Sequence, residues 1–154
     1  MRDDAPEIQL ESFIDCYEPE VAGVARSALA KLRALLPGAM ELVYDNYNAL
    51  VIGFSATEHA SHAIVSIALY PRWVNLFFLQ GAILPDPHGL LQGSGKQVRS
   101  VRLVDGTELD RPEVLDLISA AVDFGSAPFE TASHGKLIIK SISRTQRPRR
   151  PARL

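Results

Sequence analysis

The sequence predicts a single α+β domain in which an antiparallel sheet of about five strands is flanked by helices. Two apolar runs, residues 63–70 and 73–79, are rich in Val, Ile and Phe and are joined only by Pro71 and Arg72. So short a connection leaves no room for a crossover, and the pattern therefore predicts an antiparallel hairpin. Residues 98–103 alternate apolar and polar side chains, as a strand with one solvated face does.

Length and composition support one domain, because 154 residues, of which 47% are hydrophobic, are enough to form a sizeable core. The lone Cys16 has no partner for an internal disulfide, which suits a reducing cytosol. No apolar run approaches the roughly 20 residues of a membrane-spanning helix. The N-terminus lacks the layout of a signal peptide. We therefore expect a cytoplasmic domain without a membrane segment, either a monomer or a homo-oligomer.

The first expected helix, over residues 7–17, carries an acidic ridge. Glu7, Glu11 and Asp15 are spaced four apart and share one helix face, where like charges repel one another. The ridge is therefore solvated, meets cations, or holds a hard metal ion such as iron. We favour the solvated ridge and keep the iron site as an alternative.

Residues 19–36 form the clearest helix, because their apolar residues recur at the spacing of one buried stripe. Pro19 suits the first helical turn, and Pro37 with Gly38 ends the helix. We expect this helix to pack across one face of the sheet.

Two strand-like segments, residues 41–44 and 49–55, follow with a bend or bulge between them. Tyr44, Tyr47 and Asn48 could line a pocket at this bend, although turn formation and rim packing also explain them. His59 and His62 further on have the spacing of a ligand pair. They lack the third and fourth ligands that zinc sites use, so we expect no metal there and no cofactor.

The second strand of the hairpin begins with Trp73. Val74, Leu76 and Phe78 lie on one face of such a strand, while Asn75, Phe77 and Leu79 share the face of Trp73. Both faces are therefore largely apolar. This pattern predicts an interior strand covered on two sides, with a buried indole.

The loop before residues 98–103 is a candidate anion site. Gly93, Ser94, Gly95 and Lys96 resemble a P-loop, but the glycine spacing is wrong and Gln97 stands where Ser or Thr would hold magnesium. The glycines can still expose backbone N–H groups to a phosphate or carboxylate. Lys96, Arg99 and Arg102 supply nearby cations, although Arg99 and Arg102 fall on opposite faces of an ideal strand. Turn formation and solubility explain the same residues equally well.

After this strand, Asp110 and Glu113 have the spacing of a capping box that begins a helix ending at Gly125. The largely apolar run at residues 137–142 predicts a last strand. The domain therefore spans residues 1–143, and residues 144–154 form a flexible Arg/Pro-rich tail with little to bury. Clustered arginines can bind phosphate backbones, so nucleic-acid binding is a further alternative. The rest of the domain lacks a matching basic face, and this absence weighs against nucleic-acid binding.

Three segments, residues 70–78, 81–96 and 98–103, resemble the YdhG-like family of small bacterial domains of mostly unknown function. The resemblance implies an α+β fold with an antiparallel sheet flanked by helices. Some relatives are described as frataxin-like iron chaperones, and the resemblance therefore extends the iron alternative to the acidic ridge.

These observations favour binding over catalysis, since no nucleophile with an adjacent base is apparent. We expect a small anionic ligand or a protein partner at the face formed by residues 81–102. The candidate ligand-binding residues are Tyr44, Tyr47, Asn48, Trp73, Gly93, Ser94, Gly95, Lys96, Arg99 and Arg102.

Overall fold

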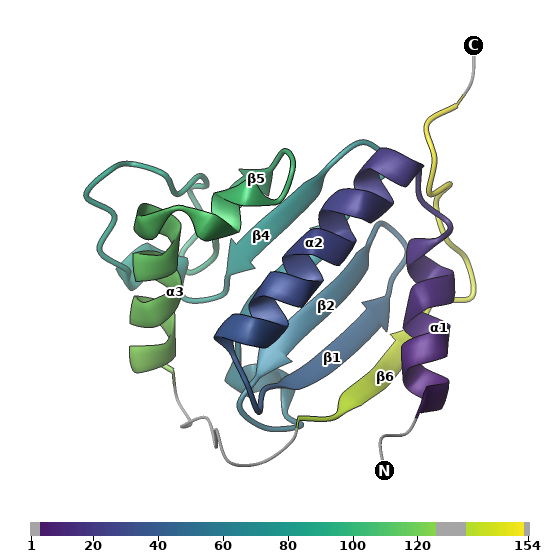
Figure 1. The fold of residues 1–154 in the computed structure, drawn as a ribbon, viewed down its shortest axis with the longest axis horizontal. Coiled ribbons are helices and arrows are strands. Elements are labelled where there is room, and N and C mark those ends of the chain that lie inside the picture. The colour runs from purple at the N-terminus through teal and green to yellow at the C-terminus, as the bar shows by residue number, and fades with distance from the viewer. Residues whose placement is uncertain (1–3, 126–134, 153–154) are drawn as a thin grey trace.

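The computed structural model describes residues 4–125 and 135–152 and contains a six-stranded sheet with α-helices packed on it (Figure 1). The helices are α1 (Asp4–Ile14), α2 (Pro19–Leu35) and α3 (Pro112–Asp123). The strands are β1 (Met40–Asp45), β2 (Leu50–Ser55), β3 (Ala63–Leu69), β4 (Val74–Phe78), β5 (Arg99–Leu103) and β6 (Leu137–Ile142). The predicted α+β class is confirmed.

The sheet is mixed, with the order β5-β4-β3-β2-β1-β6. Strands β1 to β5 form an antiparallel meander, which confirms the predicted hairpin of β3 and β4. Strand β6 lies parallel to β1 at the opposite edge. The expected number of about five strands is wrong, because the segment after Asp45 reverses the chain instead of bulging. There the Asn46 N–H donates to the Ala49 carbonyl, 2.9 Å away, and β1 and β2 are separate strands.

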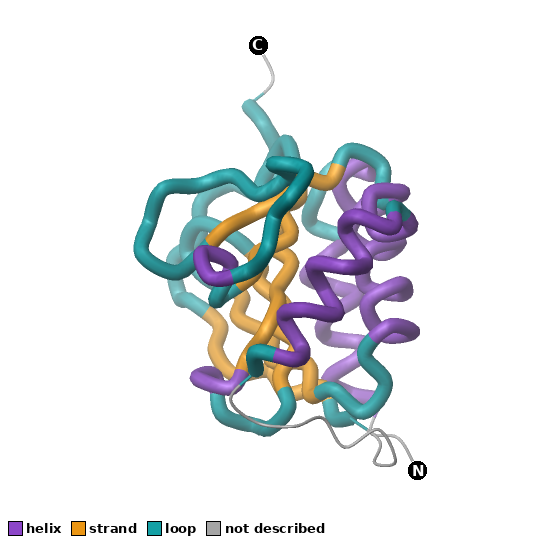
Figure 2. The backbone as a smooth tube through the Cα atoms, turned by 90° about the vertical axis from the view of Figure 1, so that its left-hand side faces the viewer, coloured by secondary structure: helices purple, strands orange, loops and turns teal. Residues whose placement is uncertain are grey.

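The α-helices cover one face of the sheet, as the turned view in Figure 2 shows. The strand register places Val43, Ile52, Ile67 and Leu76 side by side, and all four are fully buried in the core under the helices. Alternate residues of the same strands point to the other face. Every strand therefore contributes side chains to both faces of the sheet.

Helix α2 matches its predicted range closely, with Pro19 in its first turn and a buried stripe along its inner side. The predicted cap of α3 is wrong. Asp110 lies in a 3₁₀ turn, Thr107–Asp110, and Arg111 occupies the N-cap position without a side-chain cap. Instead, the Asp110 carboxylate accepts a hydrogen bond from Lys31 Nζ of α2 at 2.7 Å, because the 3₁₀ turn directs it toward that helix.

The C-terminal segment, which the sequence predicts to be a flexible tail, makes backbone hydrogen bonds with the end of β1 and the β1–β2 turn. After β6, the Ser143 N–H donates to the Asp45 carbonyl at 2.8 Å and the Arg147 N–H donates to the Tyr47 carbonyl at 2.9 Å. The segment lacks apolar side chains to bury, but its arginines find carboxylate and carbonyl partners on the domain. Residues 153–154 of the expected tail, and residues 126–134 between α3 and β6, lie outside the described part of the chain.

In the part that is described, no helix has the length and apolar character needed to cross a membrane.

Candidate functional site

An exposed aromatic and cationic corner lies where the β3–β4 turn meets β5. Arg102 pairs with Asn75 across the sheet, and its guanidinium carbon lies 4.6 Å from the centroid of the Trp73 ring. The Tyr70 ring lies beside Trp73 with the centroids 5.6 Å apart. A guanidinium above an indole face is a favourable cation–π contact. We call Tyr70, Trp73 and Arg102 the Trp73 corner.

The predicted burial of Trp73 is wrong, because its side chain is 37% exposed. Trp73 lies in the turn before β4, and α-helices cover only one face of β4 (Figure 2). Val74, Leu76 and Phe78 are buried against the helices, whereas Asn75 and Phe77 are half-buried on the face that no helix covers. An apolar strand face is therefore not sufficient to show a second covering layer.

Because Trp73 is exposed, we expect Trp73→Ala to lower the free energy of unfolding by only about 1 kcal/mol, near the centre of the range for single substitutions. A fully buried indole would lose about 3–5 kcal/mol. Urea unfolding measures the difference. In the unmodified protein, the emission of this single tryptophan should be red-shifted and readily quenched by iodide. A blue-shifted emission shielded from iodide would contradict this placement.

The glycine-rich loop closes on itself at the edge of the sheet. Gln92 and Ser100 exchange two backbone hydrogen bonds, at 2.8 and 2.9 Å, and bring the two ends of the loop together. Arg99 Nη1 donates to the carbonyl oxygens of Gly95 and Val98, at 2.6 and 2.9 Å. Arg99 therefore holds the loop backbone, and its guanidinium is directed at carbonyl groups.

The structure divides the predicted cations between two places. The register pairs Arg99 with Phe78, which lies on the face of the sheet under the helices. It pairs Arg102 with Asn75 on the opposite face, which no α-helix covers and which we call the open face. The two arginines therefore point to opposite sides of β5. Lys96, Ser94 and the loop glycines precede the N-terminal end of β5 and are exposed. Arg102 lies near the C-terminal end of the same strand. Among the predicted residues, the structure therefore brings Arg102 onto the Trp73 ring, while Arg99 is hydrogen-bonded to the Gly95 carbonyl.

The three residues predicted around the first bend also separate. Tyr44 points to the open face of the sheet, in the row that the register continues through Val51 and Ala68 to Asn75 and Arg102. Its hydroxyl is buried and, among the described residues, has no hydrogen-bond partner. Tyr47 and Asn48 are exposed in the β1–β2 turn. The Tyr47 ring lies 5.9 Å from the Arg147 guanidinium, so this residue contacts the C-terminal segment.

The acidic ridge of α1 lies against arginines of α2. Arg33 Nη1 is 2.9 Å from Glu7 Oε1, and Arg26 Nε is 3.0 Å from Glu11 Oε2. Asp15 also forms an ion pair with Arg26, and this hydrogen bond, together with Glu11, raises the pKa of the Arg26 guanidinium. The ridge therefore meets cations that belong to the chain. Within residues 4–125 and 135–152, no three His, Cys, Asp or Glu side chains are grouped as a metal site requires.

The two histidines with ligand-like spacing lie in the segment between β2 and β3. Their rings make an edge-to-face contact with centroids 5.5 Å apart, and His62 Nδ1 lies 2.8 Å from Thr57 Oγ1. This geometry supports a local packing role for the pair.

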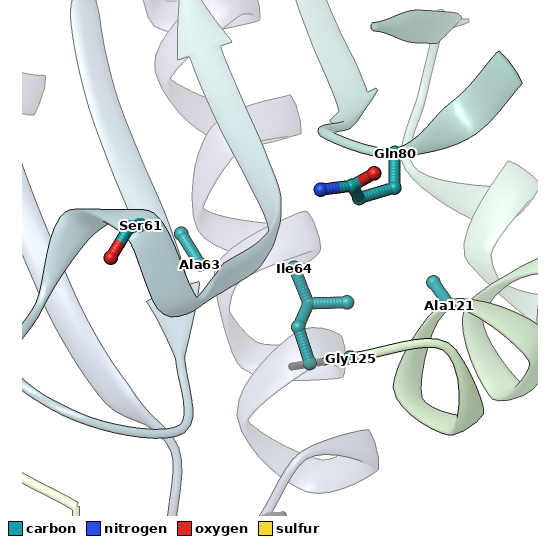
Figure 3. A pocket seen from close by; sticks show the side chains of 6 residues that line it. All are labelled: Ser61, Ala63, Ile64, Gln80, Ala121 and Gly125. Carbon is teal, nitrogen blue, oxygen red and sulfur yellow. The ribbon is translucent and has the colours of Figure 1, made fainter. Parts of the chain in front are cut away.

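Two hollows lie near α3. The first, of about 20 Å³, has room for about one water molecule and lies between the end of β4, the start of β3 and the end of α3 (Figure 3). Its lining residues are Ser61, Ala63, Ile64, Gln80, Ala121 and Gly125. The second, of about 210 Å³, lies between α3 and the loop at residues 85–90. There the Asp86 carboxylate accepts hydrogen bonds from the Leu90 and Leu91 N–H groups, at 2.9 and 3.0 Å, and so shapes the loop.

Sequence reasoning missed two features. Tyr70 belongs to the Trp73 corner, and its only signal was an aromatic residue in a hairpin turn. The second feature is a contact of Asp45 with Arg149 across 2.8 Å, between residues far apart in the chain.

Comparisons of the chain with protein-family models, curated proteins and solved structures find no match. The resemblance to YdhG-like domains therefore stays an expectation.

Proposed function

We propose that this domain is a binding module that holds a carboxylate or phosphate group at the Trp73 corner. The observation that carries the proposal is the placement of Arg102, whose guanidinium lies over the Trp73 ring and, among the described residues, has no carboxylate partner. A guanidinium stacked on an aromatic face keeps its N–H edges available for two parallel hydrogen bonds to an oxyanion.

Two further features support an anionic ligand at this corner. Arg72 is an exposed second cation in the same turn, next to Trp73. Asn75, the cross-strand neighbour of Arg102, carries an amide that can donate to the same oxyanion. The ligand is either a small anion or an acidic side chain of a protein partner, because both present the same oxygens.

The experiment follows the fluorescence of the single Trp73 in the full chain during titration with inorganic phosphate and, separately, with a Glu-rich peptide. Sodium chloride at matched ionic strength corrects for screening. We expect saturable changes, with a dissociation constant on the order of 1 mM for phosphate alone. The Arg102→Gln variant should bind at least tenfold more weakly.

Arg111→Gln is the matched control, because Arg111 is an exposed arginine before α3 with an ion pair to Glu113. It should bind both probes as the unmodified chain does. Saturation with phosphate identifies a small-anion site, and saturation with the peptide alone identifies a protein-binding site. The absence of saturation with both probes, or equal binding by Arg102→Gln, would refute the proposal.

A further inference from the structure

Arg149 of the C-terminal segment is buried against polar groups at the end of β1. Its Nη2 atom donates to Asp45 Oδ1 at 2.8 Å and to the Asn46 carbonyl at 2.5 Å, and its Nη1 atom lies 3.4 Å from the Tyr47 carbonyl. The guanidinium carbon also lies 5.7 Å from the centroid of the Tyr17 ring. The side chains of Arg149 and Asp45 are only 8% and 9% exposed. We call Tyr17, Asp45 and the Asn46 and Tyr47 carbonyls the arginine pocket.

The domain itself orients the walls of this pocket. The β1–β2 turn is closed by the hydrogen bond from Asn46 N–H to the Ala49 carbonyl. The Tyr17 hydroxyl accepts a hydrogen bond from the Leu50 N–H at 3.1 Å and donates one to the Leu69 carbonyl at 3.0 Å. None of these bonds involves the C-terminal segment. These bonds therefore fix the β1–β2 turn and the Tyr17 ring without Arg149, while the Tyr47 carbonyl also accepts a hydrogen bond from the Arg147 N–H.

The chemistry of the arginine pocket selects a guanidinium. One carboxylate and two carbonyls need several donors in a fixed planar arrangement, which arginine has and the ammonium of lysine lacks. The flanking aromatic ring adds a cation–π contact. Because Asp45 is buried, leaving its carboxylate without a counter-charge would be strongly unfavourable.

The rest of the C-terminal segment is held at the surface. Arg144, Thr145, Arg147 and Pro148 are exposed. Arg150 donates to the carbonyls of Asp15 and Cys16 after α1, where the helix dipole favours a cation. The segment makes hydrogen bonds, ion pairs and cation–π contacts with the domain, and local openings of a segment require less free energy than global unfolding.

We propose that the arginine pocket is a peptide-binding site for an arginine-bearing segment, and that residues 143–150 occupy it as an intramolecular ligand. An extended peptide that presents Arg-Pro-Arg-Arg can replace this segment. It inserts one arginine beside Asp45 and pairs its backbone with Tyr47, as Arg147 does. The tethered segment has a high effective concentration, so it competes strongly with any peptide added in solution.

The test uses full-length Arg149→Ala, which vacates the pocket but keeps the chain length. Calorimetry measures binding of a synthetic peptide of residues 143–152. We expect this variant to bind the peptide at least tenfold more tightly than the unmodified chain does. A peptide with lysine at the position of Arg149 should bind at least tenfold more weakly, and adding Asp45→Asn to the protein should remove binding.

Arg144→Ala is the matched control, since it removes an exposed arginine from the segment and leaves Arg149 in the pocket. It should resemble the unmodified chain. If Arg149→Ala is unfolded on its own, adding the peptide should restore its folded circular dichroism spectrum. A folded variant that does not bind the peptide, equal binding of the lysine peptide, or an unfolded variant that the peptide does not rescue would overturn the proposal.

Discussion

Arg33→Ala is expected to lower the free energy of unfolding by about 3–5 kcal/mol, as the loss of one partner from a buried ion pair does. Arg33 of α2 donates from Nε to Glu41 Oε2 at 2.9 Å and from Nη2 to Glu41 Oε1 at 2.7 Å. The Glu41 side chain, on β1 under the helices, is only 9% exposed. Burial disfavours the charged guanidinium, but the hydrogen bonds to Glu41 and Glu7 outweigh it and raise the pKa of Arg33.

Urea unfolding at neutral pH measures this effect. Arg111→Ala is the control, because its ion pair with Glu113 is exposed and longer, at 3.6 Å, and such pairs contribute at most about 1 kcal/mol. Replacing both partners, with Arg33→Met and Glu41→Leu, should recover much of the lost stability, since no buried charge is then left alone. A loss below about 1 kcal/mol for Arg33→Ala would show that Glu41 reaches water.

The elements that were predictable are those with local periodicity. The stripe of α2 and the apolar runs of β3 and β4 are local patterns, and these elements appear near their expected bounds. The number of strands was harder, because the residues after Asp45 are compatible with both a bulge and a reversing turn. Tertiary pairing of β1 with β2 decides between the two conformations.

The charged contacts were not predictable, because the spacing of residues shows which side chains share a face but not what packs on it. The acidic ridge of α1 meets Arg26 and Arg33, which belong to another helix, α2. The C-terminal arginines bind carbonyl groups, which carry no signature in the sequence.

The candidate site was predictable in part. Alternation along β5 was sufficient to place Arg99 and Arg102 on opposite faces, as the register shows. The contact of Arg102 with Trp73 depends on the alignment of β4 with β5 across a long loop, which no local pattern determines. The open face of β4 likewise depends on where the helices pack, and for this reason Trp73 was expected in the core.

Tyr17→Phe is expected to lower the free energy of unfolding by about 2–6 kcal/mol. The Tyr17 hydroxyl joins the start of β2 to the end of β3, since it binds the Leu50 N–H and the Leu69 carbonyl, and the residue is 1% exposed. Phenylalanine keeps the ring but leaves both backbone groups unpaired in a buried place, at about 1–3 kcal/mol each. Urea unfolding at pH 7 provides the value, and the folded spectrum of the variant shows that the packing is retained.

The same hydroxyl should make stability depend on alkaline pH. Burial raises the pKa of Tyr17 to about 12, against the lowering effect of Arg149, whereas an unfolded tyrosine has a pKa near 10. Between these values the unfolded chain loses its proton and the folded chain keeps it. The stabilising contribution is therefore complete below pH 10, falls as the pH rises toward 12, and amounts to roughly 2–3 kcal/mol. Urea unfolding from pH 9 to 11.5 should show the gap between the unmodified protein and Tyr17→Phe narrowing with pH, while other tyrosines and lysines affect both proteins equally. Parallel curves would mean that the Tyr17 hydroxyl titrates normally and does not join the two strands.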